Sequence, residues 1–320
     1  MTALIRFVLN SQPKRKRSQL DGNISGFTLI ELLVGLLLAF LVIGPLLGFM
    51  VNILDTDRKE QAKTTSEQEI QSALDYIARD LEQAVYIYDA PGVAAIGAQL
   101  PPTVAPTTVD GVPVLVFWKR QFIPNAFDMG GSTFDDAFVY SLVAYYLIKD
   151  SSCVATSTWS CAARIGRFQI KDSVNASNGA EVRAADPGFK RFDLTLNKPT
   201  LAEKMNLWTK GTSNYTSNVD TLIDFVDQST TGGFPTPSCP TVTQQVPSYT
   251  GTGAVAARFQ TSSFYACVDS SKTTAQVFLR GNSLARIRPK TAVPTYSASN
   301  SAYFPSANVT VKGRGLLGDN

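Results

Sequence analysis

The chain has 320 residues, and 44% of them are hydrophobic, which is enough apolar side chain to bury a core. The formal net charge of +3 arises at the N-terminus: residues 1–26 carry a net +4, which leaves −1 for the remainder and gives no support for nucleic-acid binding. The absence of histidine excludes Ser-His-Asp and Cys-His catalysis and metal binding through imidazole.

A basic leader is predicted at residues 1–26, ahead of a membrane-spanning segment at 27–54. Lysine and arginine fill residues 14–17, a polar stretch follows, and an apolar block begins at Phe27. The 23 residues Leu32–Leu54 carry no charge. At ~1.5 Å per residue they form a helix of about 35 Å, which crosses a hydrocarbon core of about 30 Å. The basic cluster places the N-terminus in the cytoplasm, so we predict a single-pass protein whose remaining residues are exported.

One charged residue interrupts the apolar block. Glu31 lies near its start, and an unpaired carboxylate carried deep into lipid costs about 2–4 kcal/mol. In an isolated span, such a glutamate would lie in the headgroup layer at the helix end. Its context here is GFTLIE, residues 26–31. This hexapeptide resembles the processing motif of type IV prepilins and of type II secretion pseudopilins.

The resemblance implies a defined maturation and assembly. In this family a prepilin peptidase cuts after the glycine and methylates the new N-terminal amine, which places the cut between Gly26 and Phe27. Glu31 would then pair with the ammonium group of a neighbouring subunit, neutralising two charges that lipid and filament core disfavour. The implied partners are the peptidase, other pilin or pseudopilin subunits and the assembly platform of the bacterial inner membrane. The predicted 26-residue leader is longer than in many pilins.

Other export signals fit less well. A secretory signal peptide ends in a small-x-small site after a short apolar region. Here the apolar block is long and is followed by DTDRKEQAKTTSEQ, residues 55–68. A lipoprotein needs a cysteine at the cut, whereas the first cysteine is Cys153. A plain signal anchor is a third alternative, but it does not account for GFTLIE.

The helix is predicted to continue beyond the span as an amphipathic segment, 55–90. No proline or glycine occurs between residues 55 and 88, and apolar residues recur there at spacings of three and four. We therefore expect one helix from about residue 27 to 88, ended by Pro91-Gly92. Pro45 should kink it, because proline removes a hydrogen-bond donor. A kink at Pro45 would suit an ordinary membrane helix as well as a helix that packs in a filament.

Residues 91–320 are predicted to form an exported, β-rich head domain. A loop at 91–112 is followed by strand-like runs between segments rich in Ser, Thr, Gly and Pro. One helix followed by many short strands indicates the α+β class, with a long N-terminal helix packed on a mainly antiparallel sheet. We expect strands at 114–118, 138–148, 164–170, 192–196, 264–268 and 277–279, a short helix at 200–208, helix or strand at 219–226, and a frayed tail after residue 311.

Four cysteines lie in the head: Cys153, Cys161, Cys239 and Cys267. An even number of cysteines in an exported domain favours disulfides over four free thiols. Three pairings are possible, and the sequence spacing favours Cys153–Cys161 together with Cys239–Cys267. The absence of a CxxC motif argues against a zinc ribbon or a thioredoxin-like site.

Signals for other ligands are weak, and we expect no cofactor. Asp128, Asp135 and Asp136 lie in a glycine-rich segment that could bind calcium, but the spacing does not match an EF-hand and favours a solvated turn. Lys119-Arg120, and Lys272 with the arginines of 280–290, could contact a polyanion, although solvated strand ends are the simpler interpretation. Three aromatic residues could stack on sugars but are more often core residues: Trp118, Tyr145 and Trp208.

Two functions from different classes follow. The first is a non-enzymatic minor pilin or pseudopilin in a type IV pilus-like filament or its initiation and tip complex, serving polysaccharide or protein secretion, motility or adhesion. The 294 residues after Gly26 are many for a major subunit. The segment IARDLEQAVYIYDA, residues 77–90, and the four-cysteine head are similar to cyanobacterial pseudopilins of hormogonium polysaccharide secretion. The alternative is a membrane-anchored exported enzyme or carbohydrate-binding module.

Overall fold

The computed structural model describes residues 26–101, 109–130, 132–150, 153–176, 180–231, 233–234, 237–250, 255–315 and 317. The chain divides into two compact units, residues 1–54 and residues 55–320. The leader predicted at 1–26 lies outside the described residues, except for Gly26.

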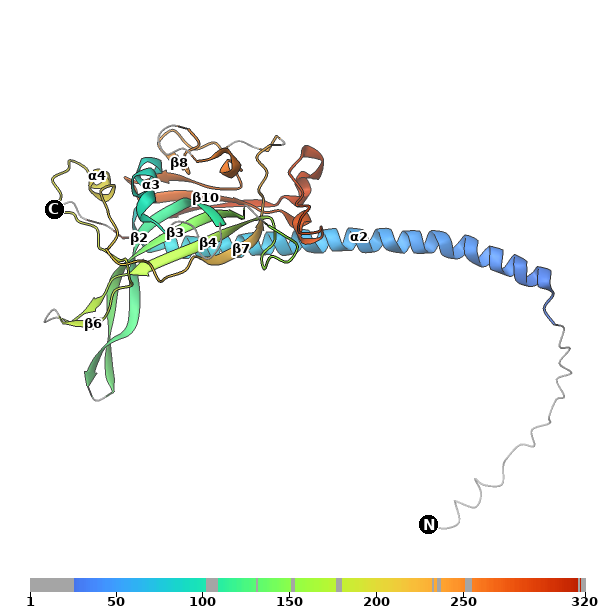
Figure 1. The fold of residues 1–320 in the computed structure, drawn as a ribbon, viewed down its shortest axis with the longest axis horizontal. Coiled ribbons are helices and arrows are strands. Elements are labelled where there is room, and N and C mark those ends of the chain that lie inside the picture. The colour runs from blue at the N-terminus through green and yellow to red at the C-terminus, as the bar shows by residue number, and fades with distance from the viewer. Residues whose placement is uncertain are drawn as a thin grey trace, which may run out of the picture. The chain divides into compact units, whose positions relative to one another are not determined.

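Helix α2 spans Leu29–Glu82 and contains 54 residues (Figure 1). In the second unit, α2 buries one stripe of side chains at spacings of three and four, which places them on one face. The buried residues are Ala62, Ser66, Ile70, Ala73, Leu74, Ile77, Asp80 and Leu81. The predicted amphipathic second half of the helix is thereby confirmed.

The prediction that the helix runs to residue 88 was wrong. α2 ends at Glu82, and Ala84–Ile87 forms strand β1, antiparallel to β2 (Val109–Gly130). The segment AVYI fits helical spacing, but all four of its side chains are buried and its backbone pairs with the edge of the sheet. Valine, isoleucine and tyrosine are also favoured in strands. Burial from both sides therefore overrides the helical pattern.

Pro91 and Gly92 lie within a helix instead of in a loop. Asp89 caps α3, Ala90–Ile96, and its carboxylate accepts a hydrogen bond from the N–H of Gly92 at 3.0 Å. Proline is tolerated in a first turn, because the N–H it lacks would have no helical partner there. A Cβ on Gly92 would lie 2.9 Å from Tyr88 Cδ1, so close packing requires glycine. A short 3₁₀ turn, Gly97–Gln99, follows.

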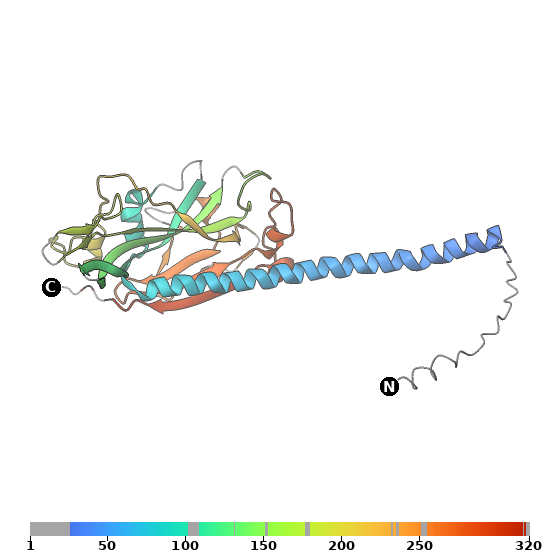
Figure 2. The same ribbon diagram turned by 90° about the horizontal axis from the view of Figure 1, so that it is seen from below.

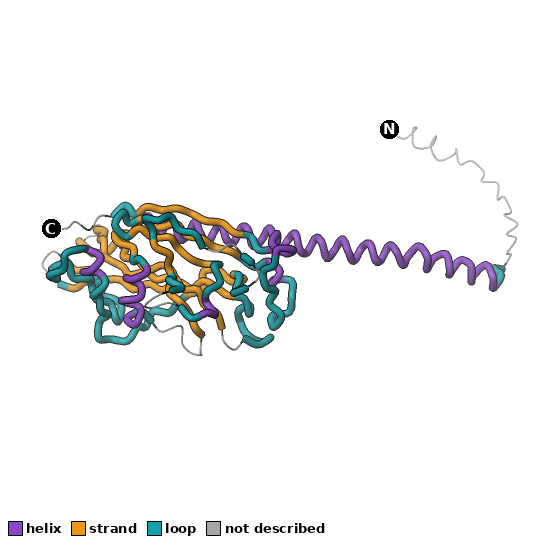
Figure 3. Tube along the Cα trace, turned by 90° about the horizontal axis from the view of Figure 1, so that it is seen from above, coloured by secondary structure: helices purple, strands orange, loops and turns teal. Residues whose placement is uncertain are grey.

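Two antiparallel sheets make up most of the head (Figures 1 and 3). The larger has the order β1-β2-β3-β4-β7, with β3 at Thr133–Asp150, β4 at Ala163–Lys171 and β7 at Asp220–Val226. The smaller has the order β11-β10-β9-β8, with β8 at Gln244–Val246, β9 at Phe264–Asp269, β10 at Thr274–Arg280 and β11 at Ser306–Lys312. A two-stranded ribbon joins β5 (Val174–Asn175) to β6 (Glu181–Arg183).

The predicted α+β class is confirmed. The second half of α2 runs along the smaller sheet (Figure 2), and its buried stripe shares one core with side chains of both sheets. The sheets are joined at two corners by backbone hydrogen bonds. Asn282 N–H donates to Phe225 O at 2.7 Å, and Gly315 N–H donates to Ala84 O at 3.1 Å. A Cβ on Gly281 would lie 2.7 Å from Ile70 Cδ1, so glycine lets this corner approach the helix.

The strands predicted at 114–118, 138–148, 164–170, 264–268 and 277–279 are confirmed, whereas the predictions for 192–196 and for the tail were wrong. Residues 192–196 form no strand: Phe192 turns its ring onto Trp118, with ring centroids 5.0 Å apart, and Asp193 accepts hydrogen bonds from Thr195. The tail expected to fray after Val311 continues β11 to Lys312 and then bonds to β1. The helix predicted at 200–208 is α4, Leu201–Met205, and 219–226 contains β7.

Two disulfides join the four cysteines. Cys153 pairs with Cys161 and Cys239 pairs with Cys267, both with Cα–Cα distances of 5.5 Å. These are the pairings that the sequence spacing favoured. The second disulfide ties the segment before β8 to β9. Disulfides persist in oxidising compartments, so they point to an extracytoplasmic head.

Candidate membrane and assembly interface

The first 26 residues of α2, Leu29–Leu54, bury no side chain in the structure. Their large apolar side chains are between 46% and 85% exposed. Soluble proteins rarely leave such an area in water, so lipid or protein must cover it. α2 is the one helix among the described residues that is long and apolar enough to cross a membrane, a property that an export signal shares. The helix is therefore a membrane span or an export signal.

The GFTLIE motif lies at the start of this helix. Gly26 and Phe27 precede it, and Phe27 is 81% exposed. Thr28 caps the helix: its Oγ1 accepts a hydrogen bond from the N–H of Glu31 at 3.3 Å. Glu31 therefore occupies the third helical position, where a carboxylate complements the positive end of the helix dipole. Sequence reasoning missed this role, although the T-x-x-E spacing of a capping box was visible.

The glycines of this segment meet no packing demand within the chain. A Cβ on Gly26, Gly35, Gly44 or Gly48 would meet nothing within 4 Å. Pro45 lies inside α2, and its missing N–H leaves the carbonyl oxygen of Leu41 without a helical donor. The predicted kink at Pro45 stays a prediction. Any requirement for these small residues must come from contacts with lipid or another molecule.

A buried charge network fastens α2 to the larger sheet. Asp80, which is 7% exposed, accepts hydrogen bonds from Lys119 Nζ at 2.8 Å, Arg167 Nε at 2.7 Å and Tyr145 OH at 2.7 Å. Burial alone would raise the pKa of Asp80, but the hydrogen bonds and charges of Arg167 and Lys119 outweigh it and hold the pKa below its usual range. We call these four residues the Asp80 network. It connects α2 to β2, β3 and β4 at one point.

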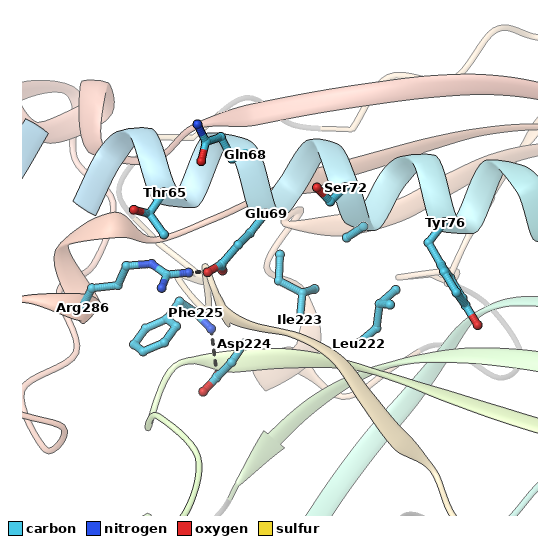
Figure 4. Close-up of a pocket in the computed structure, with 11 residues that line it drawn as sticks. Thr65, Gln68, Glu69, Ser72, Tyr76, Leu222, Ile223, Asp224, Phe225 and Arg286 are labelled. Atoms are coloured by element: carbon cyan, nitrogen blue, oxygen red, sulfur yellow. Dashed lines mark hydrogen bonds and ion pairs between the residues drawn. The ribbon is translucent and has the colours of Figure 1, made fainter. Parts of the chain in front are cut away.

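A groove of about 620 Å³ runs between α2 and β7, the outer strand of the larger sheet (Figure 4). Arg286 closes one end: its Nε donates to Ser66 Oγ at 2.9 Å, its Nη2 pairs with Glu69, and its guanidinium lies 4.2 Å from the centre of the Phe225 ring. The groove is lined by Thr65, Gln68, Glu69, Ser72, Ala73, Tyr76, Leu222, Ile223, Asp224, Phe225 and Arg286.

We expect Arg286→Ala to lower the free energy of unfolding of the head by about 1–2 kcal/mol, since it removes hydrogen bonds and stacking at a largely buried guanidinium. Urea unfolding followed by tryptophan fluorescence measures this, because all three tryptophans lie in the head. Arg286→Lys should recover part of the loss, since lysine keeps the charge without the planar fork. An Arg286→Ala variant with an unchanged free energy of unfolding would contradict a stabilising role for this contact.

The other predicted ligand residues do not come together in one site. Asp128, Asp135 and Asp136 lie near the turn of the β2–β3 hairpin, where each accepts a hydrogen bond from a nearby backbone N–H. Within the described ranges, no group of three or more Asp, Glu or Cys residues could hold a metal ion. The three aromatic residues considered for sugar stacking are at most 5% exposed and belong to the core: Trp118, Tyr145 and Trp208.

The basic residues considered for polyanion binding are largely paired. Lys119 belongs to the Asp80 network, Lys272 pairs with Asp269 at 3.1 Å, and Arg280 pairs with Asp227 at 2.9 Å. Arg120, in contrast, is exposed, and its guanidinium lies 4.2 Å from the centre of the Phe138 ring. The structure thus separates Lys119 from its neighbour Arg120: one faces the core and the other faces solvent.

Comparison with models of protein families, with curated proteins and with solved structures gives no match for this chain. The class of protein is therefore defined by architecture alone. A long apolar N-terminal helix whose second half packs on antiparallel sheets is a pilin-like architecture. The two disulfides of this pilin-like chain point to an extracytoplasmic head, because disulfides persist in oxidising compartments.

Proposed function

We propose that this chain is a non-enzymatic minor pilin or pseudopilin, a structural subunit of a type IV pilus-like filament or of its initiation and tip complex. One observation carries the proposal: the exposed apolar half of α2 has a single charged residue, Glu31, and this residue ends the GFTLIE motif. An anchor alone needs no carboxylate at this position. A helix that packs against copies of itself has a use for one.

The physical argument concerns charge pairing in a dry environment. Cleavage between Gly26 and Phe27 would create an ammonium group two residues before the helix begins. Glu31 is the one charged residue within 29–54, so its carboxylate has no cationic partner in this segment and the ammonium has no anionic partner there other than a Glu31 carboxylate. Pairing between neighbouring subunits neutralises both charges and sets the stagger of adjacent helices. The unoccupied space around Gly35, Gly44 and Gly48 permits close helix approach.

The proposed location and partners follow from this role. The chain would sit in the bacterial inner membrane as a single span with its N-terminus in the cytoplasm, and its head would lie in the periplasm or in an extracellular filament. Its partners would be the prepilin peptidase, other pilin or pseudopilin subunits and the assembly platform. A large head limits side-by-side packing, which favours a minor or tip role. Polysaccharide or protein secretion, motility and adhesion are all compatible with such a subunit.

The mass of the N-terminal peptide tests the proposal. We expect native membranes or sheared filaments to yield a peptide that begins at methylated Phe27, because the peptidase would cut after Gly26 and methylate the new amine. A Gly26→Leu variant is the control and should keep the uncleaved N-terminus. A wild-type peptide that still begins at Met1, or that begins after residue 55, would contradict the pilin proposal and favour an ordinary anchored or secreted domain.

A further inference from the structure

The β2–β3 hairpin extends beyond the rest of its sheet (Figure 1). It also carries many of the exposed apolar side chains of the head. Outside 27–54, ten large hydrophobic side chains are strongly exposed among the described residues, and five of them lie on this hairpin or on β6 beside it. These five are Phe122, Met129, Phe134, Phe138 and Val182. Clustered apolar exposure of this kind marks a contact surface more often than chance placement does.

The two faces of the hairpin differ. One face is covered by the β5–β6 ribbon, where Ile123, Ala126 and Val139 form a small core with Val174. On the open face Phe122 and Phe138 are direct cross-strand partners, with ring centroids 5.3 Å apart and exposures of 48% and 55%. The described residues therefore leave this aromatic pair uncovered.

The open face is basic on the side of the pair nearer the sheet. Arg120 lies opposite Tyr140 and stacks on Phe138, while the Arg191 guanidinium lies 4.4 Å from the centre of the Tyr140 ring. Neither arginine has an ion pair within the described ranges. The backbone N–H of Asp172 donates to the carbonyl oxygen of Tyr140, and its carboxylate accepts the N–H of Ser173. Arg120 and Arg191 thus place two guanidinium groups at this end of the open face.

The open face is acidic on the other side of the pair, toward the turn. Asp136 lies two residues before Phe138, on the same face of β3, and accepts the N–H of Asn125 at 2.9 Å. Asp128, opposite Phe134, accepts the N–H of Gly130 at 2.8 Å. Arg183 of β6 donates to the carbonyl oxygen of Asn125 and pairs with neither carboxylate. This end is negative.

We propose that the open face of the hairpin is a self-complementary contact between two copies of this chain. Tyr140 and Asp136 lie two residues to either side of Phe138, about 6.7 Å away in each direction along the strand. A two-fold axis through Phe138 therefore sets the arginines beside Tyr140 in one copy against Asp136 in the other, and the aromatic pairs against each other. Such an isologous interface satisfies both charged ends at once. It uses no residue of α2, so it goes beyond the proposed filament role and is independent of maturation.

A charge swap tests the contact. Sedimentation of the full chain in detergent micelles should show a weak dimer with a dissociation constant of about 1–100 μM, as expected for a small interface. Arg120→Asp or Asp136→Arg alone should raise the dissociation constant of the dimer at least about tenfold. Each change places like charges opposite each other at both of the symmetry-related contacts between the two copies. The double variant Arg120→Asp/Asp136→Arg should restore the dissociation constant to within about threefold. If the effects of the two substitutions on the free energy of dimerisation simply add in the double variant, the proposal is overturned. A chain that stays monomeric at about 1 mM would also overturn it.

Cross-linking gives a second test that does not depend on charge. All four native cysteines are in disulfides, so Phe138→Cys adds a single free thiol in the described part of the chain. A residue on the two-fold axis faces its own copy, so mild oxidation should yield a covalent dimer. Leu207→Cys, at a position that is 51% exposed and outside the hairpin, should yield at least tenfold less. Equal cross-linking of the two variants would contradict the contact. A monomer that binds poly-glutamate through Arg120 would assign the face to an acidic partner instead.

Discussion

Replacing Asp80 with asparagine should lower the free energy of unfolding of the head by about 3–5 kcal/mol, because it leaves two buried cations without a counter-charge. Lys119 is 6% exposed, and the Arg167 side chain is 16% exposed. Asparagine offers one acceptor oxygen in place of two, so it cannot satisfy Lys119, Arg167 and Tyr145 together. Urea unfolding of the full chain in detergent, followed by tryptophan fluorescence, measures the difference.

Asp75→Asn is the matched control. Asp75 lies on the exposed side of α2 and accepts one hydrogen bond, from Gln71 Nε2 at 3.0 Å. Its replacement should change the free energy of unfolding by less than about 0.5 kcal/mol. The double variant Asp80→Asn/Lys119→Met should recover part of the loss, since it removes one of the unpaired cations. Equal losses for Asp80→Asn and Asp75→Asn would show that the Asp80 network does not fasten the helix to the sheet.

The network also predicts the direction of acid sensitivity. The pKa of Asp80 lies below its unfolded value, so the ionised carboxylate stabilises the fold above the unfolded pKa of about 3.9. This contribution should be lost progressively as the pH falls through the lower folded pKa. The Asp80→Asn variant should therefore lose less stability than the wild type as the pH falls from 5 to 2, because it has no carboxylate to protonate at this position.

Replacing Glu31 with valine should reduce incorporation into filaments at least about a hundredfold, while the chain still inserts in the membrane. Valine suits the apolar segment, so insertion is not impaired. Assembly should fail because the ammonium group of each neighbour loses its counter-charge in a dry contact. The ratio of protein in the sheared-filament fraction to protein in the membrane fraction measures this effect.

Glu31→Gln separates charge pairing from helix capping. Glutamine keeps the shape of glutamate and serves equally well at the third position of a capping box, but it carries no charge. We expect this variant to fail in assembly as Glu31→Val does. Filaments at the wild-type level from Glu31→Gln would show that assembly does not need the charge of Glu31 and would contradict the pairing argument. An anchored exported module would tolerate both changes.

Local sequence patterns were sufficient for the elements whose environment is uniform along their length. The charge-free run of Leu32–Leu54 and the apolar stripe that begins at Ile70 both predicted α2. The long apolar run of 138–148 predicted the centre of β3. The same patterns misassigned Ala84–Ile87 and missed β11, because both segments pair with strands that are distant in the sequence.

The long N-terminal helix, its charge-free half with Glu31 near the start, the disulfide-bonded β-rich head and the α+β class could all be predicted from residue patterns. The end of α2, the cations that meet Asp80, and the inward side chain of Lys119 beside the outward side chain of Arg120 emerge from the folded arrangement. The physical reason is that periodicity records whether a residue meets apolar or polar surroundings. It does not record which distant strand supplies a hydrogen bond or a counter-charge, because register is set when the sheets close around the helix.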